Sequence, residues 1–332
     1  MTPRHLGAGG PVVGAVALGC MGMSEFYDPV GEREAIATIH RALDLGVTLI
    51  DTSDMYGRGA NERLVGRALH DRRERAVLAT KGGIVRDADD ATYRSIDGRP
   101  AYLRAALDAS LARLGVDHVD LYYLHRADPK VPIEESVGAL HELVQAGKAR
   151  ALGLSEVSGA TLRRAAAVAP VAALQSEYSL FTRDVETNGV LIAARDLGIT
   201  LVAYAPLGRG ILTGALRSTG SLGADDLRRR VPRFDPGNFE RNLALVDALT
   251  TVASDAGVTP AQLALAWLLT RGDDLIALPG CERVAHLEEN ARAADLRLDG
   301  ATLARVDALF PPGAAAGGRL HDPRLAPTPL SS

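Results

Sequence analysis

Four polar residues stand at or just beyond the ends of short apolar segments, and together they suit proton transfer. Asp51, Lys81 and His125 each directly follow an apolar segment of strand character, and Tyr56 comes shortly after Asp51 in the segment D-T-S-D-M-Y-G. If these segments are parallel strands of one barrel, their carboxyl ends meet at the face where such folds place their chemistry. The pattern therefore predicts that the four side chains form one site.

Reduction of a carbonyl group is the chemistry that this set of residues suits. A hydride that reaches a carbonyl carbon leaves negative charge on the oxygen, which must be protonated or stabilised as it develops. Tyr56 is the candidate acid, and a neighbouring Lys81 ammonium is expected to lower the pKa of its phenol from about 10. Asp51 is expected to hold the ammonium in place. His125 is expected to bind the substrate oxygen and to help relay the proton.

Lysine usage strengthens the case for Lys81. Of the 37 basic residues in the chain only Lys81, Lys130 and Lys148 are lysines, so arginine serves almost wherever a positive charge suffices. A compact ammonium fits beside a phenol or a carboxylate, whereas a guanidinium is bulky and flat. Each residue taken singly also has an ordinary structural explanation: a strand-end lysine that reaches solvent, an aspartate cap, a loop tyrosine, or a hydrogen-bonded core histidine.

Strand and helix patterns alternate along most of the chain, which is typical of parallel β/α units. We count eight units and predict a single (β/α)8 TIM barrel, with an N-terminal hairpin at 6–12 and a long loop after the seventh strand. The expected strands are 15–18, 47–50, 76–80, 119–124, 149–154, 171–176, 200–204 and 275–278. The expected helices are 32–45, 61–69, 101–114, 134–146, 160–167, 186–197, one opened by Thr259 and Pro260, and 284–293.

The chain is expected to form one domain, 1–332, because 332 residues accommodate one barrel with insertions. The barrel itself is expected at about 6–310. The Gly- and Arg-rich connection 208–238 is predicted to be a lid, since long connections in compact domains are usually functional. The low-complexity tail 311–332 is expected to have little intrinsic order and to reach the mouth of the site.

Composition argues against several classes of partner. A net charge of −4 offers no electrostatic footprint for nucleic acid. The chain has no apolar run long enough to span a bilayer and no signal-peptide core at its N-terminus, so the cytoplasm is the expected location. Two cysteines, Cys20 and Cys281, are too few for a disulfide framework, and no Cys or His pair has the spacing of a zinc site. The oligomeric state stays open.

Several segments together resemble the aldo-keto reductase family, from about Leu6 to Leu309. The order Asp51, Tyr56, Lys81, His125 is the order of the family's catalytic tetrad. The segments are D-T-S-D-M-Y-G, A-T-K-G-G, L-Y-Y-L-H-R-A-D, G-L-S-E, Q-S-E-Y-S-L, Y-A-P-L-G-R-G-I-L-T-G and L-E-E-N. The likeness is to bacterial and plant members that act on aldehydes, near the pyridoxal and perakine reductases. It implies reduction of an aldehyde or ketone to an alcohol, with Tyr56 as general acid.

The resemblance also implies a nicotinamide cofactor, bound without the G-x-G-x-x-G fingerprint that this chain lacks. Tyr204 matches the aromatic residue that stacks under the nicotinamide ring, and Ser155 and Gln175 match its carboxamide partners. Glu289 and Asn290 match the pair that contacts the adenine. The turn that matches the pyrophosphate segment, where glycines allow close backbone approach, contains Pro206, Leu207, Gly208, Gly210 and Leu212.

The choice between NADP(H) and NAD(H) depends on the segment after the eighth strand. Arg283 enters a helix whose N-terminus suits an anion, so it is expected to hold a 2′-phosphate. Family members that select NADP(H) commonly carry a small hydroxyl residue where Cys281 stands, and basic residues where Glu282 and His286 stand. Glu282 would repel a phosphate and suits a ribose hydroxyl instead. We expect NADP(H), with NAD(H) possible.

The sequence does not name the carbonyl substrate, a small molecule. Tyr27, Met55 and Arg126 are the candidates for the lining of its pocket. Two alternatives remain open: a regulatory partner protein of the same fold, as the potassium-channel β-subunits are, and a lyase or Schiff-base aldolase with Lys81 as nucleophile. The tyrosine and aspartate expected beside Lys81 argue against the second.

Overall fold

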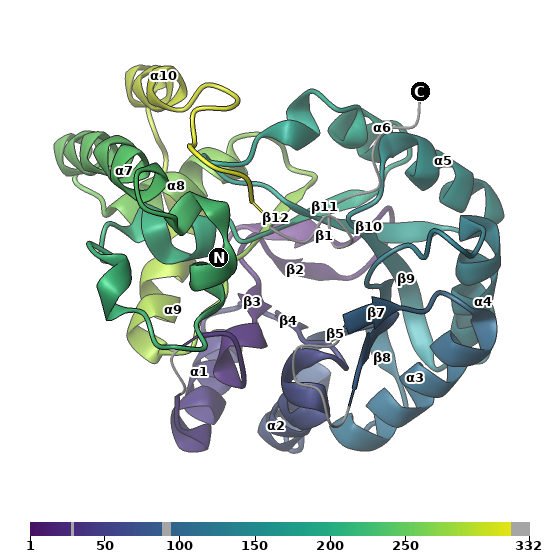
Figure 1. Ribbon diagram of the computed structural model, residues 1–332. Coiled ribbons are helices and arrows are strands. Elements are labelled where there is room, and N and C mark those ends of the chain that lie inside the picture. The colour runs from purple at the N-terminus through teal and green to yellow at the C-terminus, as the bar shows by residue number, and fades with distance from the viewer. Residues whose placement is uncertain (28–29, 88–93, 320–332) are drawn as a thin grey trace.

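A parallel eight-stranded sheet with helices around it forms the centre of the molecule (Figure 1). The computed structural model describes residues 1–27, 30–87 and 94–319. Around the sheet the strands are β3 (Leu18–Gly19), β4 (Leu49–Asp51), β5 (Val77–Gly82), β8 (Val119–Leu124), β9 (Ala149–Ser155), β10 (Val171–Glu177), β11 (Thr200–Tyr204) and β12 (Leu275–Leu278). The predicted (β/α)8 barrel is confirmed.

Backbone hydrogen bonds join the first barrel strand to the last and so close the sheet. Gly19 bridges Gly280 in parallel, and the Ala17 N–H donates to the Ala277 carbonyl at 2.8 Å. The Ala277 N–H donates in turn to the Ala15 carbonyl at 2.9 Å. The strand expected at 15–18 therefore pairs first with β12, and its ladder to β4 begins only at the end of that segment.

A short antiparallel hairpin, β1 (Pro3–His5) and β2 (Val12–Gly14), covers the amino-terminal end of the barrel. The predicted hairpin segment 6–12 contains the turn and the first residue of β2, so the hairpin extends beyond the predicted bounds on both sides. Leu6 and Val13 join an apolar cluster with side chains of the barrel strands. The Gly7 N–H donates at 2.8 Å to the hydroxyl of Thr200, the first residue of β11. Because the hairpin occupies this end, the carboxyl ends of the strands are left for chemistry.

Eight helices correspond to the predicted ones, and their apolar faces pack against the sheet in one large core. They are α1 (Glu32–Asp44), α2 (Ala60–Leu69), α3 (Pro100–Leu114), α4 (Ile133–Gln145), α5 (Gly159–Val168), α6 (Val190–Asp196), α8 (Pro260–Leu269) and α9 (Val284–Arg292). The Thr259 side chain accepts from the Gln262 N–H at 3.2 Å, so the predicted cap begins α8. Two further helices, α7 (Asn238–Asp255) and α10 (Gly300–Leu309), and the hairpin of β6 (Ile84–Arg86) and β7 (Arg94–Ile96) were not predicted.

The long connection after the seventh strand contains four short 3-10 helices joined by irregular segments. They are η5 (Gly208–Thr213), η6 (Thr219–Ser221), η7 (Leu227–Arg230) and η8 (Pro232–Phe234). The Leu227 N–H donates to the Phe26 carbonyl at 2.9 Å, so the connection reaches the loop that follows β3. It therefore spans part of the carboxyl end of the barrel, as a lid would.

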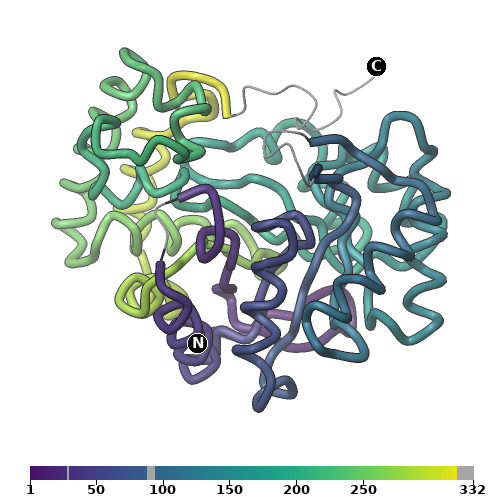
Figure 2. Tube along the Cα trace, turned by 60° about the horizontal axis from the view of Figure 1, so that its bottom comes forward, coloured from purple at the N-terminus to yellow at the C-terminus, as the bar shows by residue number. Residues whose placement is uncertain are grey.

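The C-terminal segment up to residue 319 lies beside this connection (Figure 2). Asn242 of α7 holds it through two hydrogen bonds with the backbone of Ala316, at 3.0 and 2.8 Å. Residues 311–319 are thus more structured than their composition predicted, because a side chain outside the segment satisfies their backbone. The rest of the predicted tail, 320–332, lies outside the described residues. Across the described ranges no helix is long and apolar enough to cross a membrane.

Candidate active site

The structure brings the four residues of the predicted tetrad to the carboxyl ends of neighbouring strands. Asp51 ends β4, Lys81 lies near the end of β5, and His125 directly follows β8. Tyr56 begins the 3-10 helix η2 (Tyr56–Gly59), just beyond β4. Since β4, β5 and β8 are adjacent in the sheet, one region of the barrel mouth holds all four side chains, each of them buried.

Lys81 makes most of the contacts within this group. Its Nζ atom contacts Asp51 Oδ1, donates to the Thr52 carbonyl at 2.8 Å and donates to the Tyr56 hydroxyl at 3.2 Å. The same ammonium lies 4.9 Å from the centre of the Tyr56 ring. On the other side, Gln175 Nε2 donates to Asp51 Oδ2 at 2.9 Å. A residue of β10 thus fixes the carboxylate that orients Lys81.

Burial decides the protonation state of the tyrosine. It raises the pKa of Tyr56 above the ordinary value of 10, and the charge of Lys81 offsets only part of that effect. Burial lowers the pKa of Lys81, but Asp51 and Tyr56 outweigh it, so this pKa lies above its usual value. The expectation that Lys81 brings the phenol below its ordinary pKa is therefore wrong. The phenol stays protonated at neutral pH, which is the form that an acid needs.

The imidazole of His125 is neutral and stands edge-on to the phenol. The two ring centres are 6.0 Å apart and the rings are 88° from parallel. Burial, assisted by the charges of Arg126 and Lys81, holds the pKa of His125 well below its usual value of 6.5. Its Nδ1 atom lies 3.1 Å from the hydroxyl of Ser53, so Nε2 is the ring nitrogen left to meet a substrate.

An apolar wall lies next to the tyrosine. Met55, Tyr56 and Ile84 form a buried cluster, with Met21 and Phe26 packed against it. Met55, a predicted pocket residue, is therefore placed beside the candidate acid. Tyr27 has different neighbours: the Arg228 guanidinium lies 5.2 Å from its ring centre, and the structure does not bring Tyr27 into this cluster.

Arg126 places a positive charge between the tetrad and the predicted cofactor residues. Its Nη1 atom donates to the His125 carbonyl at 2.7 Å and to the Ser155 hydroxyl at 3.0 Å. The side chain is partly exposed. Its place in the pocket lining stays a prediction.

The residues that match the nicotinamide site continue around the barrel from the tetrad. Ser155 ends β9, Gln175 lies in β10 and Tyr204 ends β11, and these strands follow β8 in order around the sheet. The hydrogen bond from Gln175 to Asp51 connects the two groups directly. A ring bound at Tyr204 would thus lie on the same face as the tetrad.

Backbone strain is concentrated at this face. Among the described residues, all five non-glycine residues with positive φ lie in loops that follow barrel strands: Phe26, Arg58, Glu156, Ala205 and Arg209. Such conformations cost on the order of 1–3 kcal/mol each and persist where the surroundings enforce them. Arg209 belongs to the turn matched to the pyrophosphate, together with Gly208 at φ 57° and Gly210 at φ 91°, and Ala205 directly precedes this turn. Pro206, Leu207 and Leu212 of this turn are buried.

Opposite charges stand at the beginning of α9, as the sequence predicted. Arg283 is exposed at the N-cap position. The Glu282 carboxylate packs against Gly22, where an added Cβ would lie 1.9 Å from Oε1. Burial raises the pKa of Glu282, and neighbouring cations counteract this. Cys281 is buried before them, Glu289 lies partly exposed on α9, and Asn290 is buried there.

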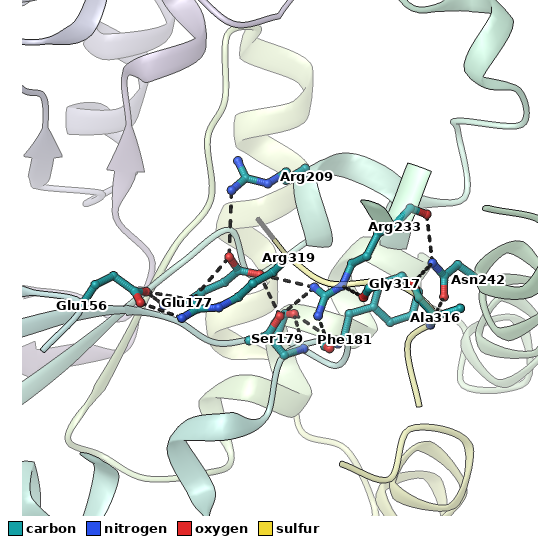
Figure 3. A network of polar contacts seen from close by, with 11 residues as sticks. Glu156, Glu177, Ser179, Phe181, Arg209, Arg233, Asn242, Ala316, Gly317 and Arg319 are labelled. Carbon is teal, nitrogen blue, oxygen red and sulfur yellow. Dashed lines mark hydrogen bonds and ion pairs between the residues drawn. The ribbon is translucent and has the colours of Figure 1, made fainter. Parts of the chain in front are cut away.

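Two buried carboxylates at the mouth, Glu156 and Glu177, were not assigned from the sequence. Arg319 donates to both oxygens of Glu156, at 3.0 and 2.7 Å (Figure 3). Arg233 Nη1 lies 3.3 Å from Glu177 Oε1, and Arg209 Nη2 lies 3.9 Å from Glu177 Oε2. The network ties the pyrophosphate-matching turn, η8 and the C-terminal segment to the ends of β9 and β10. The described part of the tail thus reaches the mouth, as expected.

We expect Arg319→Met to lower the free energy of unfolding at pH 7 by about 1.5–3 kcal/mol, because it removes a charge-assisted pair from a buried carboxylate. Arg319 overcomes the effect of burial and holds the pKa of Glu156 below its ordinary 4.5. A carboxyl group whose pKa is lower in the folded than in the unfolded protein stabilises the fold at pH values above its unfolded-state pKa. This stabilisation is lost as the pH falls through the folded-state pKa. Urea denaturation at pH 7 and at pH 3 measures both effects.

The matched control is Arg305→Met, which breaks the exposed pair with Asp255 and should change stability little at either pH. An equal loss for Arg319→Met at both pH values would show that the guanidinium acts through packing instead of charge.

The chain is similar to known proteins along most of its length. A family model described as the Aldo/keto reductase family matches residues 15–310. Aldo-keto reductase yakc (NADP(+)) of Schizosaccharomyces pombe (strain 972 / ATCC 24843) is 45% identical over 320 residues, 92% of this chain and 94% of that protein. The glycerol dehydrogenase AKR11B4 from Gluconobacter oxydans has a TM-score of 0.84 at 34% identity, covering 92% of this chain and 94% of that chain. An aldo-keto reductase from Klebsiella pneumoniae in complex with NADPH has a TM-score of 0.74 at 27% identity, covering 97% and 100%.

Proposed function

This chain belongs to the aldo/keto reductase family, and on that basis we propose that it reduces an aldehyde or ketone to an alcohol with NADP(H). The observation that carries the proposal is the contact between the buried Lys81 ammonium and the Tyr56 hydroxyl, at 3.2 Å, with Asp51 on the other side of the ammonium. A panel of aldehydes and ketones, followed by loss of NADPH absorbance, tests the function and identifies substrates.

Each tetrad residue has a distinct task in this proposal. A bound nicotinamide would supply the hydride to the carbonyl carbon. The Tyr56 hydroxyl gives its proton to the carbonyl oxygen as charge develops there. Lys81 stabilises the phenolate left behind, and Asp51 keeps the ammonium charged and in place. His125 binds the substrate oxygen through Nε2.

The residues at the ends of β9 to β12 fit a nicotinamide dinucleotide. Tyr204 offers an aromatic face, and Ser155 and Gln175 offer polar groups for a carboxamide. The glycines of the strained turn let the backbone approach a pyrophosphate closely. Arg283 at the N-terminus of α9 suits a 2′-phosphate, and Glu289 and Asn290 on the same helix are proposed to contact the adenine. The NADP(+) in the yakc name and the NADPH in the Klebsiella structure support NADP(H).

We expect Arg283→Ala to raise the dissociation constant of NADPH about tenfold and to leave that of NADH nearly unchanged, because only NADPH carries the 2′-phosphate. Conversely, Glu282→Lys should strengthen selectivity for NADPH by replacing a repulsive neighbour with an attractive one. Titration of each cofactor into the variants measures these affinities without a known substrate. Tighter binding of NADH than NADPH to the wild type, or equal weakening by Arg283→Ala, would make Glu282 a ribose ligand and overturn the preference.

The alternative of Schiff-base chemistry at Lys81 is disfavoured by the charge of its amine. A nucleophilic amine must be neutral, yet Lys81 contacts the Asp51 carboxylate and its pKa lies above the ordinary value. Borohydride should therefore trap no substrate on this lysine.

We further propose that the chain is one barrel domain acting in the cytoplasm on a small-molecule carbonyl compound, with Met55, Arg126 and Tyr27 in the pocket lining. The position of Met55 beside Tyr56 supports its part in this lining. The contacts of Arg126 with the His125 carbonyl and Ser155 support a second polar wall.

A further inference from the structure

The hydroxyl of Ser53 lies between three possible acceptors at the edge of the tetrad. It is 3.1 Å from His125 Nδ1, 3.2 Å from Asp54 Oδ1 and 3.4 Å from the Lys81 carbonyl. The Met55 N–H donates to the same oxygen at 3.3 Å. The Lys81 carbonyl already accepts the Asp54 N–H at 3.2 Å, so it is the weaker competitor. Because a hydroxyl has one proton, Ser53 donates either to the histidine or to the aspartate.

This choice determines which ring nitrogen of the neutral His125 carries hydrogen. If Ser53 donates to the ring, Nδ1 is bare and Nε2 carries the hydrogen. If Ser53 donates to Asp54, its lone pair faces Nδ1, so Nδ1 carries the hydrogen and Nε2 is bare. A carbonyl oxygen only accepts hydrogen bonds, so it needs the first tautomer. An alcohol hydroxyl, the donor in the reverse reaction, pairs with the second.

We propose that Ser53 is a positioning residue that sets the tautomer of His125, and that the charge on Asp54 selects between the two tautomers. An ionised carboxylate is a stronger acceptor than a neutral imidazole nitrogen, so ionised Asp54 takes the Ser53 proton. Neutral Asp54 leaves that proton to His125 and so presents an Nε2–H to the carbonyl. The proposal rests on the reductase function given above and adds a second proton-controlled step to it.

The surroundings of Asp54 place its ionisation near neutral pH. The groups that face it are Glu62 of α2, Tyr102 and Arg113 of α3, and Tyr122 of β8. Burial and the Glu62 carboxylate raise the pKa of Asp54 to about 7, against the smaller effects of Ser53 and Arg113. Glu62 is itself paired with Arg113, whose Nε donates to it at 2.6 Å. Since His125 stays neutral in this range, the change in Asp54 alters the position of the ring hydrogen and not the charge of the ring.

The first test is the pH dependence of kcat/KM for reduction. In the wild type it should fall about tenfold from pH 6 to pH 8, as loss of one proton near 7 requires. Asp54→Asn should remove this fall, since a neutral side chain leaves the Ser53 proton on His125. The control is Asp97→Asn, which removes another carboxylate that acts on Tyr102 but pairs with Arg99 instead of Ser53. Ionisation of Tyr56 does not contribute to the fall in kcat/KM between pH 6 and pH 8, because the pKa of Tyr56 lies above 10.

The second test determines the tautomer of His125 by NMR, without measuring turnover. The 15N chemical shifts of the His125 ring, assigned by comparison with His125→Gln, distinguish a bare from a protonated Nδ1. In the wild type Nδ1 should be bare at pH 6 and protonated at pH 8, and in Asp54→Asn bare at both. Ser53→Ala should abolish the pH dependence, and Ser53→Thr, which keeps the hydroxyl, should restore it.

The outcomes separate this proposal from the reductase function. The role of Ser53 would be overturned, and the reductase function kept, in either of two cases. In the first, the enzyme reduces carbonyls fully but His125 has the same tautomer at both pH values. In the second, Asp54→Asn leaves the pH dependence of kcat/KM unchanged. A tautomer that changes as expected in a protein that reduces no carbonyl on the panel would support the Ser53 relay and contradict the function.

Discussion

Tyr56→Phe should lower the rate of carbonyl reduction about 10²–10⁴-fold, while the protein keeps its fold and its affinity for the cofactor. The substitution removes only the hydroxyl that lies 3.2 Å from Lys81 Nζ. Phenylalanine keeps the edge-on contact with the His125 ring and the apolar contacts with Met55 and Ile84. Steady-state turnover on a good aldehyde, together with NADPH titration, measures the two properties separately.

The matched control for this variant is Tyr102→Phe, which removes a partly buried phenol on α3 that makes no contact with Lys81. It should retain most of the turnover at pH 6, where Asp54 is neutral in both proteins. Near wild-type turnover in Tyr56→Phe would show that another group donates the proton, and the assignment of the acid would fail.

Lys81→Met is expected to reduce turnover about 10–10³-fold, because a charge close to a phenol shifts its pKa by about 1–3 units. Lys81 lowers the pKa of Tyr56 against the effect of burial, so its loss should move the basic limb of the pH–rate profile to still higher pH. Cofactor affinity should change much less, since the ammonium contacts Asp51, Thr52 and Tyr56 and none of the proposed cofactor residues.

Two further variants separate chemistry from stability at this position. Lys81→Met leaves the buried Asp51 carboxylate without its cation, which destabilises the fold, whereas the double variant Asp51→Asn with Lys81→Met removes both charges. The double variant should recover thermal stability but not turnover. Lys148→Met, at an exposed pair with Asp108, controls for loss of a lysine. A Lys81→Met protein that binds cofactor poorly and turns over normally would show that the lysine faces the cofactor.

The eight-unit barrel and the tetrad could be predicted because both produce patterns within short segments of the sequence. Strands buried on both faces are largely apolar, so an ionisable residue at or directly after the end of one stands out. Asp51, Lys81 and His125 all carry this signal. Glu156 and Glu177 also lie at or just beyond the ends of strands, but their partner Arg319 is so distant in sequence that no spacing suggests the pair. Helices α7 and α10 were missed because the alternation of eight units does not require them.

The remaining errors concern properties that depend on burial and not on residue type. Lys81 does lie beside Tyr56, but the net direction of the phenol's pKa depends on how completely the pair is desolvated. Ser53 and Asp54 look like ordinary turn residues in D-T-S-D-M-Y-G. Their significance arises only when β8 places His125 Nδ1 within 3.1 Å of the serine.

The backbone hydrogen bonds that close the barrel between residues 15–19 and 277–281 have a consequence for biosynthesis. Residues 15–19 leave the ribosome early, yet their hydrogen-bond partners at 277–281 are made near the end of the chain. At about 5–20 residues per second, the nascent sheet keeps an unpaired first edge for roughly 13–52 s. Unpaired edges recruit other strands, so the growing chain is most prone to aggregation before its last strand appears. Synthesis that stops before residue 277 leaves an open sheet and no smaller barrel.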